Sequence, residues 1–378
     1  MAEVIVNNPF VVGKYLSDKY FCDRETETEF LRKQMTNGRN VALISPRRLG
    51  KSGLIRHLFN QPDIREHYYV FFVDIYATSS LAEFVYLLGK EIYEVLKPLP
   101  TVWKEKFFQL MTSLRVGFKL DPMTGLPGLD LGLGDIHSPE TTLDEIFNYL
   151  AQADKPCIIA IDEFQQIQTY TEKNVEALLR TKIQQCQSAQ FIFAGSKRHM
   201  MSNMFTSPAK PFYQSAISMG LEAIPINTYA DFAIRLFEER GKSVEREVVE
   251  KVWKKYEGYT WFVQMMMNEL FALTPEKDCC RADMIEEARK NIILSQEGSY
   301  KDILANVPPK QKTVLQAIAK EGVAKNVTSG SFIKKYNLNS ASSVQAAIKL
   351  LLKNDIITTT DVGYRIYDYF FSDCCVGP

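Results

Sequence analysis

The sequence predicts an α/β fold in which helices sandwich a parallel sheet, followed by an all-α lid and a C-terminal winged helix-turn-helix domain. Three observations support this prediction. Short, nearly continuous apolar runs alternate with helical patterns over residues 1–220, as expected of strands buried on both faces of a parallel sheet. Residues 221–298 carry helical patterns alone. Residues 299–378 show the order helix, short helix, turn, helix and hairpin, which is typical of a winged helix.

The first region contains five candidate strands separated by helical stretches such as Ser52–Phe59 and Leu81–Leu96. This alternation is typical of a parallel sheet with crossover helices. Residues 115–134 interrupt the alternation with a Pro- and Gly-containing segment that predicts an inserted β-hairpin. The expected strands are Val41–Ser45, Tyr69–Asp74, Cys157–Asp162, Gln190–Ser196 and Ala216–Met219.

The second region predicts a small helical lid. Gly241 and Gly258 each follow a helical pattern and are plausible helix ends, because glycine readily adopts the left-handed conformation found there. Pro275 marks a third end. The expected helices are Tyr229–Arg240, Val244–Tyr256, Trp261–Leu273 and Cys280–Leu294.

The third region begins near Pro308-Pro309 and predicts the winged helix. Its expected helices are Lys310–Lys320, Ser331–Tyr336 and Ala341–Asn354, and its expected hairpin strands are Ile356–Thr360 and Tyr364–Tyr367. We therefore expect three domains, over residues 1–220, 221–298 and 299–378.

Composition limits the class of protein. Hydrophobic residues make up 46% of the 378 residues, which is typical of a globular chain with a core. Forty-five basic residues balance 45 acidic ones, and this excludes a polycation that coats nucleic acid but allows a local basic face. The chain has no apolar run long enough for a membrane span and no secretory signal. Its seven cysteines do not fit a disulfide framework, so we expect a cytoplasmic protein.

The strongest local signal is the run Ser-Pro-Arg-Arg-Leu-Gly-Lys-Ser between a strand and a helix. A tight loop that leads into a helix N-terminus offers several backbone N–H groups to phosphate oxygens, and the helix dipole adds to the attraction. Lys51 would contact the β- and γ-phosphates, and the Ser52 hydroxyl would bind Mg²⁺. The expected nucleotide-binding residues are Ser45, Pro46, Arg47, Arg48, Leu49, Gly50, Lys51, Ser52 and Gly53.

A second signal is the buried strand Cys157–Asp162, which ends in two carboxylates. In an enzyme with a phosphate loop, the first carboxylate at this position holds Mg²⁺ and the second polarises the attacking water. We therefore expect Asp162 at the metal and Glu163 as the catalytic base. The alternative is a strand followed by an acidic helix start, since carboxylates favour helix N-termini.

A third signal is Ser196, at the tip of the strand expected between the two nucleotide-binding strands. There it would sense the γ-phosphate or the attacking water, although serine is also common where a strand passes into a loop. Four basic residues compete for a role beside the phosphates, and the sequence does not select among them. They are Arg47, Arg48, Lys197 and Arg198.

Taken together, these motifs resemble those of the archaeal-type ATPases in the STAND/AAA+ group of P-loop NTPases, over almost the whole chain. Pro46–Ser52 is similar to the family's P-R-R-x-G-K-[ST] loop, and Ile161–Gln165 to its I-D-E-[FI]-Q segment. Asn8-Pro9-Phe10 and Tyr20–Glu25 are similar to its N-terminal NPF…F-x-G-R-E segment. The resemblance implies an ATPase that uses ATP/ADP and Mg²⁺, with Pro9 and Phe10 close to the adenine.

The chain departs from the family pattern at several positions. Ser45 stands where the loop usually begins with Gly, and Asp23 replaces another Gly. The family's L-Y-G-R motif corresponds to Phe212-Tyr213-Gln214-Ser215, so its arginine is absent here. These departures leave open a nucleotide-held switch with little or no turnover as the alternative to an active ATPase.

The C-terminal region is mildly basic, with ten Lys/Arg and six Asp/Glu residues and hence a net charge of +4 in residues 299–378. Serine and glutamine can contact base edges and lysine can contact phosphate. This winged helix would bind either DNA or a partner protein, and a DNA-binding regulator is a further alternative. Self-association also stays open. The candidate nucleic-acid contacts are Lys334, Lys335, Gln345, Lys349 and Lys353.

Overall fold

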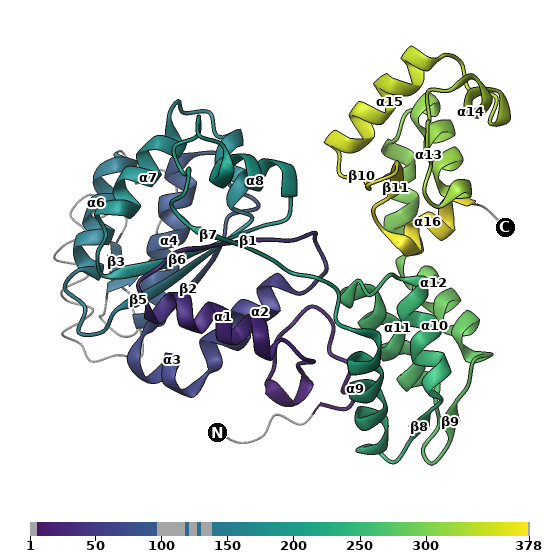
Figure 1. Cartoon of the computed structure of the whole chain (residues 1–378), viewed down its shortest axis with the longest axis horizontal. Coiled ribbons are helices and arrows are strands. Elements are labelled where there is room, and N and C mark those ends of the chain that lie inside the picture. The colour runs from purple at the N-terminus through teal and green to yellow at the C-terminus, as the bar shows by residue number, and fades with distance from the viewer. Residues whose placement is uncertain (1–5, 97–117, 121–126, 130–137, 377–378) are drawn as a thin grey trace. The chain divides into compact units, whose positions relative to one another are not determined.

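Figure 1 shows the computed structural model of the chain, which describes residues 6–96, 118–120, 127–129 and 138–376. The chain folds as two compact units. The sheet unit runs from Gly13 to Ile224, and the helical unit contains Pro225 onward together with the N-terminal segment that ends at Val12. None of the helices in the described ranges has an apolar stretch long enough to cross a bilayer.

A five-stranded parallel sheet forms the centre of the sheet unit, in the order β2-β5-β6-β1-β7. Its strands lie within one residue of their predicted ends. Strand β6, which leads to Ser196, pairs with β1 on one side and β5 on the other, as predicted. Because all strands run in one direction, their carboxyl ends meet at one edge of the sheet. The strands are β1 (Val41–Ile44), β2 (Tyr69–Asp74), β5 (Cys157–Asp162), β6 (Ala189–Gly195) and β7 (Ile217–Gly220).

Helices cover both faces of this sheet (Figure 1). One face carries α1 (Glu25–Thr36) and α2 (Lys51–Asn60), with the short α3 (Pro62–His67) after them. The other face carries α4 (Leu81–Leu96), α6 (Pro139–Leu150), α7 (Val175–Gln185) and α8 (Arg198–Thr206). The described residues of this unit also include the 3₁₀-helices η1 (Asp18–Tyr20) and η4 (Phe164–Thr169).

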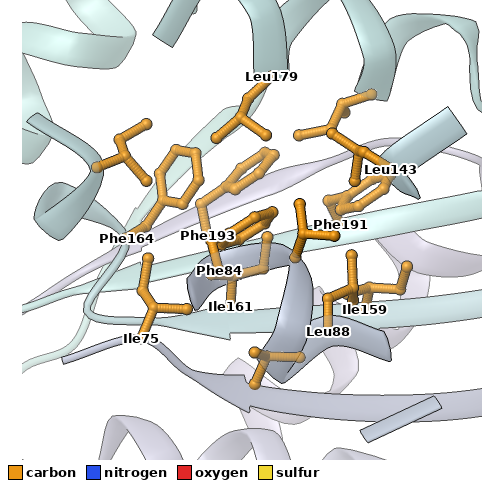
Figure 2. Close-up of a cluster of buried hydrophobic side chains, with 14 of the residues drawn as sticks. Ile75, Phe84, Leu88, Leu143, Ile159, Ile161, Phe164, Leu179, Phe191 and Phe193 are labelled. Carbon is orange, nitrogen blue, oxygen red and sulfur yellow. The ribbon is translucent and has the colours of Figure 1, made fainter. Parts of the chain in front are cut away.

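A hydrophobic core of the sheet unit lies under this second layer of helices (Figure 2). Ile159 and Ile161 of β5 and Phe191 and Phe193 of β6 belong to it. Their neighbours Ile158 and Ile192 are equally buried but lie outside this cluster, since successive side chains of a strand point to opposite faces. Burial on both faces explains why the strands lack an apolar–polar alternation in the sequence. The helices contribute residues such as Phe84, Leu88, Leu143 and Leu179.

The predicted insertion over residues 115–134 is described in part. The strands β3 (Phe118–Leu120) and β4 (Pro127–Leu129) pair antiparallel. The remainder of that range lies outside the described residues.

The first part of the helical unit contains four helices and a small parallel strand pair that the sequence did not predict. Ser243 and Val244 (β8) pair with Cys279 and Cys280 (β9). The helix expected from Cys280 therefore begins only at Met284, and the one expected from Val244 begins at Arg246. Val244 and Cys280 are both buried, so their backbone N–H and C=O groups are shielded from water. The strand pair supplies hydrogen-bond partners for these groups. The helices are α9 (Ile226–Glu238), α10 (Arg246–Lys255), α11 (Thr260–Leu273) and α12 (Met284–Asn306).

The winged helix follows in the predicted order, with one added helix. Two serines begin its helices, since Ser329 Oγ accepts from the Phe332 N–H and Ser340 Oγ from the Ser343 N–H, each at 3.2 Å. The strands β10 (Ile357–Thr359) and β11 (Tyr364–Ile366) pair antiparallel as the wing. The helices are α13 (Pro309–Glu321), α14 (Gly330–Lys335), α15 (Ala341–Lys353) and the added α16 (Tyr369–Val376).

Within the helical unit, the wing and α16 pack directly on the preceding helices. Arg365 of β11 donates to Glu257 Oε2 at 2.8 Å, and its guanidinium lies 4.1 Å from the centroid of the Tyr369 ring. Arg289 of α12 contacts Asp373 of α16 at 2.9 Å. The predicted boundary after residue 298 falls inside α12, so the division into three domains stays a prediction.

Candidate nucleotide-binding site

The phosphate loop joins β1 to α2 at the carboxyl edge of the sheet. Two of its residues have left-handed backbones, Arg48 at φ 68° and Gly50 at φ 97°. Glycine suits the second position, because φ values this far into the positive range are costly for residues with a Cβ. The turn ends as the Leu54 N–H donates to Gly50 O at 2.9 Å, and α2 begins. The first N–H groups of α2 therefore point into the loop, where an anion binds favourably.

Lys51 lies at the centre of this loop and is only 5% exposed. Its ammonium donates to Ser45 O at 2.9 Å and to Pro46 O at 3.0 Å. Burial lowers the pKa of Lys51, while Glu163 and Asp162 raise it and Arg47 lowers it further. An ammonium group has three donors, and two of them serve the loop carbonyls. The third is available for a phosphate oxygen.

Asp162 ends β5 and is buried beside the start of α2. Its Oδ2 accepts from the Ser52 hydroxyl at 2.5 Å, and its Oδ1 accepts from the Glu163 N–H at 3.0 Å. Burial raises the pKa of Asp162, opposed by the Ser52 hydrogen bond; Glu163 raises it further and Lys51 lowers it. A hydroxyl and a carboxylate are oxygen ligands of the kind Mg²⁺ prefers. The pair therefore fits the predicted metal site.

Glu163 has a left-handed backbone, with φ at 55°, which turns its side chain away from the line of β5. Its Oε2 accepts from the Ser196 hydroxyl at 2.6 Å and from the Gln165 amide. Its Oε1 lies 3.8 Å from Arg47 Nε. Of the four basic residues that competed for a role here, the structure brings Arg47 to the Glu163 carboxylate, and its guanidinium also lies 5.0 Å from the Tyr76 ring centroid.

Gln165 is the site residue that the residue-by-residue sequence reasoning missed. It is buried at the start of η4, where its amide reaches Glu163. Its Oε1 packs against Gly195, which has no room for a Cβ beside Gln165 and Met201. The signal was present, because Gln165 closes the segment that resembles the family's I-D-E-[FI]-Q motif. The spacing of residues in the sequence could not assign a role to Gln165. The 3₁₀ turn that brings its side chain back to Glu163 has no recognisable sequence pattern.

The N-terminal segment lies in the other unit. The Phe10 ring is fully buried, with the Phe237 and Phe271 ring centroids 5.4 and 5.9 Å away. Asn268 fixes the segment by donating to Phe10 O at 2.7 Å and accepting from Asn8 through its own carbonyl at 2.8 Å. Phe10 therefore has a packing role in the helical unit. Contact of Pro9 or Phe10 with a nucleotide stays a prediction.

Two departures from the family pattern keep the backbone that glycine would adopt. Asp23 and Gln214, which both stand at family glycine positions, have φ values of 60° and 54°. Each carries the modest cost of a side chain in the left-handed region. Ser215, at the position of the missing arginine, donates its hydroxyl to Phe212 O at 2.7 Å. The turn is thus retained without the arginine.

The candidate nucleic-acid residues lie on the surface of the winged helix. Gln345, Lys349 and Lys353 are exposed and four residues apart, so they share one stripe of α15. Lys334 is exposed on α14. Lys335 is exposed as well, but it pairs with Glu321 at 2.7 Å.

Solved structures are similar to this chain along nearly its whole length, while no curated protein sequence matches it significantly. A Walker-type ATPase of Pyrococcus abyssi has 18% identity and a TM-score of 0.63, over 97% of this chain and 99% of that one. The Aeropyrum pernix ORC2 protein, solved as ADPNP–ADP complexes, has 12% identity and a TM-score of 0.60, over 97% and 95%. The ORC1 protein of that organism, solved with DNA, has 13% identity and a TM-score of 0.51, over 94% and 92%. Identities this low establish a shared fold.

Two protein families match the sequence itself. A probable winged helix domain matches residues 298–374, from the end of α12 into α16. An ATPase domain predominantly from Archaea matches residues 21–266, which include Lys51, Asp162 and Ser196. This second match covers more than half of the chain. The protein therefore belongs to the family of ATPase domains found predominantly in Archaea, and it carries a winged helix domain at its C-terminal end.

Proposed function

We propose that this protein binds ATP, hydrolyses it with Mg²⁺, and passes the nucleotide state to its winged helix. One observation carries the proposal: the phosphate loop, Asp162, Glu163 and Ser196 come from three different strand ends and are joined by hydrogen bonds at one sheet edge. The family match and the nucleotide complexes of the ORC2 relative support it.

The proposed roles follow from the contacts. Lys51 keeps the loop carbonyls and uses its remaining donor on the β- and γ-phosphates. Ser52 and Asp162 would hold Mg²⁺, which neutralises charge on the phosphates when bound. Glu163 accepts the proton of the attacking water, and Ser196 and Gln165 orient its carboxylate.

Two substitutions test the hydrolytic role. Glu163→Gln is expected to slow phosphate release at least about 100-fold while nucleotide binding persists, because the amide cannot accept the proton. Lys51→Ala is expected to abolish both binding and release, since it removes the cation at the centre of the loop. Lys90→Ala, which changes an exposed lysine of α4, serves as the control. Turnover in Lys51→Ala equal to that of the parent protein would refute the proposal.

The alternative is a switch that retains nucleotide and turns it over little by itself. The absence of the motif arginine at Ser215 favours it. It predicts tight nucleotide retention and a protease sensitivity that differs between ADP and ATP. Several turnovers per minute by the isolated protein would exclude this alternative.

A second candidate function is DNA binding through α15. The exposed stripe of Gln345, Lys349 and Lys353 favours it, and the ORC1 relative was solved with DNA. Replacing Lys349 and Lys353 together is expected to weaken binding of a labelled duplex and to flatten its salt dependence. The control variant replaces Lys310 and Lys320, two exposed lysines of α13, and so removes the same positive charge away from α15. Equal losses in both double variants would indicate attraction by net charge alone. Docking of a partner protein on the winged helix, self-association and a cytoplasmic location stay predictions.

A further inference from the structure

Ser45 links the phosphate loop to three other parts of the sheet unit. It follows β1 directly and is 1% exposed. Its N–H donates to Gly195 O at 3.2 Å, and its carbonyl accepts from Lys51 Nζ at 2.9 Å. Its hydroxyl donates to Leu221 O at 3.0 Å. The last bond requires a side chain, so the glycine that usually begins such a loop cannot make it.

Leu221 begins the segment by which the chain leaves the sheet unit. This exit segment, residues 221–224, follows β7 and ends where the helical unit begins at Pro225. Leu221 and Ile224 are buried. The next carbonyl, that of Glu222, accepts from Arg24 at 2.6 Å. Two consecutive carbonyls of the exit segment are therefore held by two different elements, the phosphate loop and the residue before α1.

We propose that Ser45 is a positioning residue that transmits occupancy of the phosphate loop to the exit segment. This inference rests on the proposed nucleotide binding. A phosphate that accepts from the third donor of Lys51 shifts the ammonium group that also holds Ser45 O, so the position of Ser45 follows that engagement. The Ser45 hydroxyl then carries the displacement to Leu221 O, at the start of the path into the helical unit.

The Arg24 contact provides a second tie of the exit segment, separate from that of Ser45. Arg24 is buried, pairs with Glu27 at 2.7 Å and has no contact with the phosphate loop among the bonds described for it. The exit segment is thus tied to the phosphate loop through Ser45 and to the start of α1 through Arg24. Movement of the first tie relative to the second changes the conformation of residues 221–224.

Hydrogen–deuterium exchange of the full chain, with and without Mg·ATP, tests the inference. Ser45→Ala removes the hydroxyl alone, and Ser215→Ala removes a hydroxyl that also bonds a backbone carbonyl near the exit segment but has no tie to the loop. A fluorescent ATP analogue measures affinity in parallel. In Ser45→Ala we expect exchange in residues 221–224 about fivefold faster without nucleotide, the size that one hydrogen bond gives.

The decisive readout is the difference in exchange between the nucleotide-bound and nucleotide-free states. It is expected to fall by at least about half in Ser45→Ala and to persist in Ser215→Ala, with each variant compared at a nucleotide concentration that saturates it. A full difference in Ser45→Ala would overturn the inference. Nucleotide binding by the parent protein without any response of residues 221–224 would also overturn it, and would leave the proposed function intact. No binding at all would refute the proposed function itself.

Discussion

Two buried cations of this protein lie beside acidic side chains in different arrangements. One is Lys51 at the carboxyl edge of the sheet, and the other is Arg365, which forms the wing contact with Glu257. At the sheet edge, Lys51 bonds loop carbonyls and faces two acids, Asp162 and Glu163, which are held by hydroxyl and amide donors. In the helical unit, Arg365 pairs with Glu257 and its guanidinium lies over the rings of Tyr369 and Tyr259. The first arrangement keeps several acceptors and donors directed at one point, whereas the second encloses its cation. Burial of charge alone therefore does not distinguish the candidate nucleotide-binding site from a structural contact.

The largest expected effect concerns the tight packing of the sheet edge. Gly195→Ala is expected to lower the free energy of unfolding by about 3 kcal/mol and to slow turnover, because a Cβ would displace Gln165 and Met201. Gly220→Ala is the matched control, since both glycines pair with Ile44 and the described residues leave open space at Gly220. Calorimetric unfolding of the two variants checks the difference. Equal destabilisation would show that the sheet edge has room to adjust.

The next effect tests whether the wing contact is structural. Arg365→Ala is expected to lower the stability of the helical unit by about 2 kcal/mol, because it removes packed stem atoms and a cation–π contact. Arg246→Ala removes an exposed ion pair with Asp231 and should cost well under about 1 kcal/mol. Denaturant titration followed by tryptophan fluorescence measures both, since Trp253 and Trp261 lie in this unit. A loss no greater than the Arg246→Ala loss would contradict the structural role.

A third prediction uses the raised pKa of Asp162. Because burial disfavours its charged form, ionisation at neutral pH costs the folded state free energy, and this cost disappears as the pH falls through the raised folded pKa. Asp162→Asn is therefore expected to stabilise the fold at pH 7 while turnover is lost. The stability gain should shrink toward pH 4, which unfolding curves at several pH values would show. A gain that is independent of pH would assign the effect to packing.

The smallest effect concerns the acid of the wing contact. Glu257 is 56% exposed, whereas Arg365 is buried. Glu257→Gln is expected to cost about 0.5 kcal/mol, because water already screens the carboxylate. A double-mutant cycle with Arg365→Ala isolates the pair. An interaction free energy between Arg365 and Glu257 above about 2 kcal/mol would contradict this screening by water.

Strand positions and the principal site residues could be predicted for one physical reason. Doubly buried parallel strands are continuous in apolar residues, and their carboxyl ends converge, so Lys51, Asp162 and Ser196 had to be neighbours. Gly241 and Gly258 marked helix ends because both adopt positive φ. These are local signals that tertiary packing did not override.

Features that depend on distant partners could not be predicted. Arg365 and Glu257 are 108 residues apart in the chain, and neither lies in a sequence motif that predicts their pairing. The helices expected from Val244 and Cys280 each include one residue of the pair β8–β9, because two-residue strands have no period. The helix α16 contains two phenylalanines and two cysteines in eight residues, a composition that does not favour a helix; packing of Phe370 on Tyr256 stabilises it there.

The wing contact also limits what the C-terminal domain can recognise. Arg365 is the only arginine in residues 299–378. Guanine is read most often by the two parallel donors of a guanidinium, whereas lysine acts as a hydrated point charge. With that guanidinium enclosed, a duplex on α15 would meet lysines, one glutamine and the exposed Ser342. Such a surface would follow the sugar–phosphate backbone and would lack the bidentate guanidinium contact to guanine.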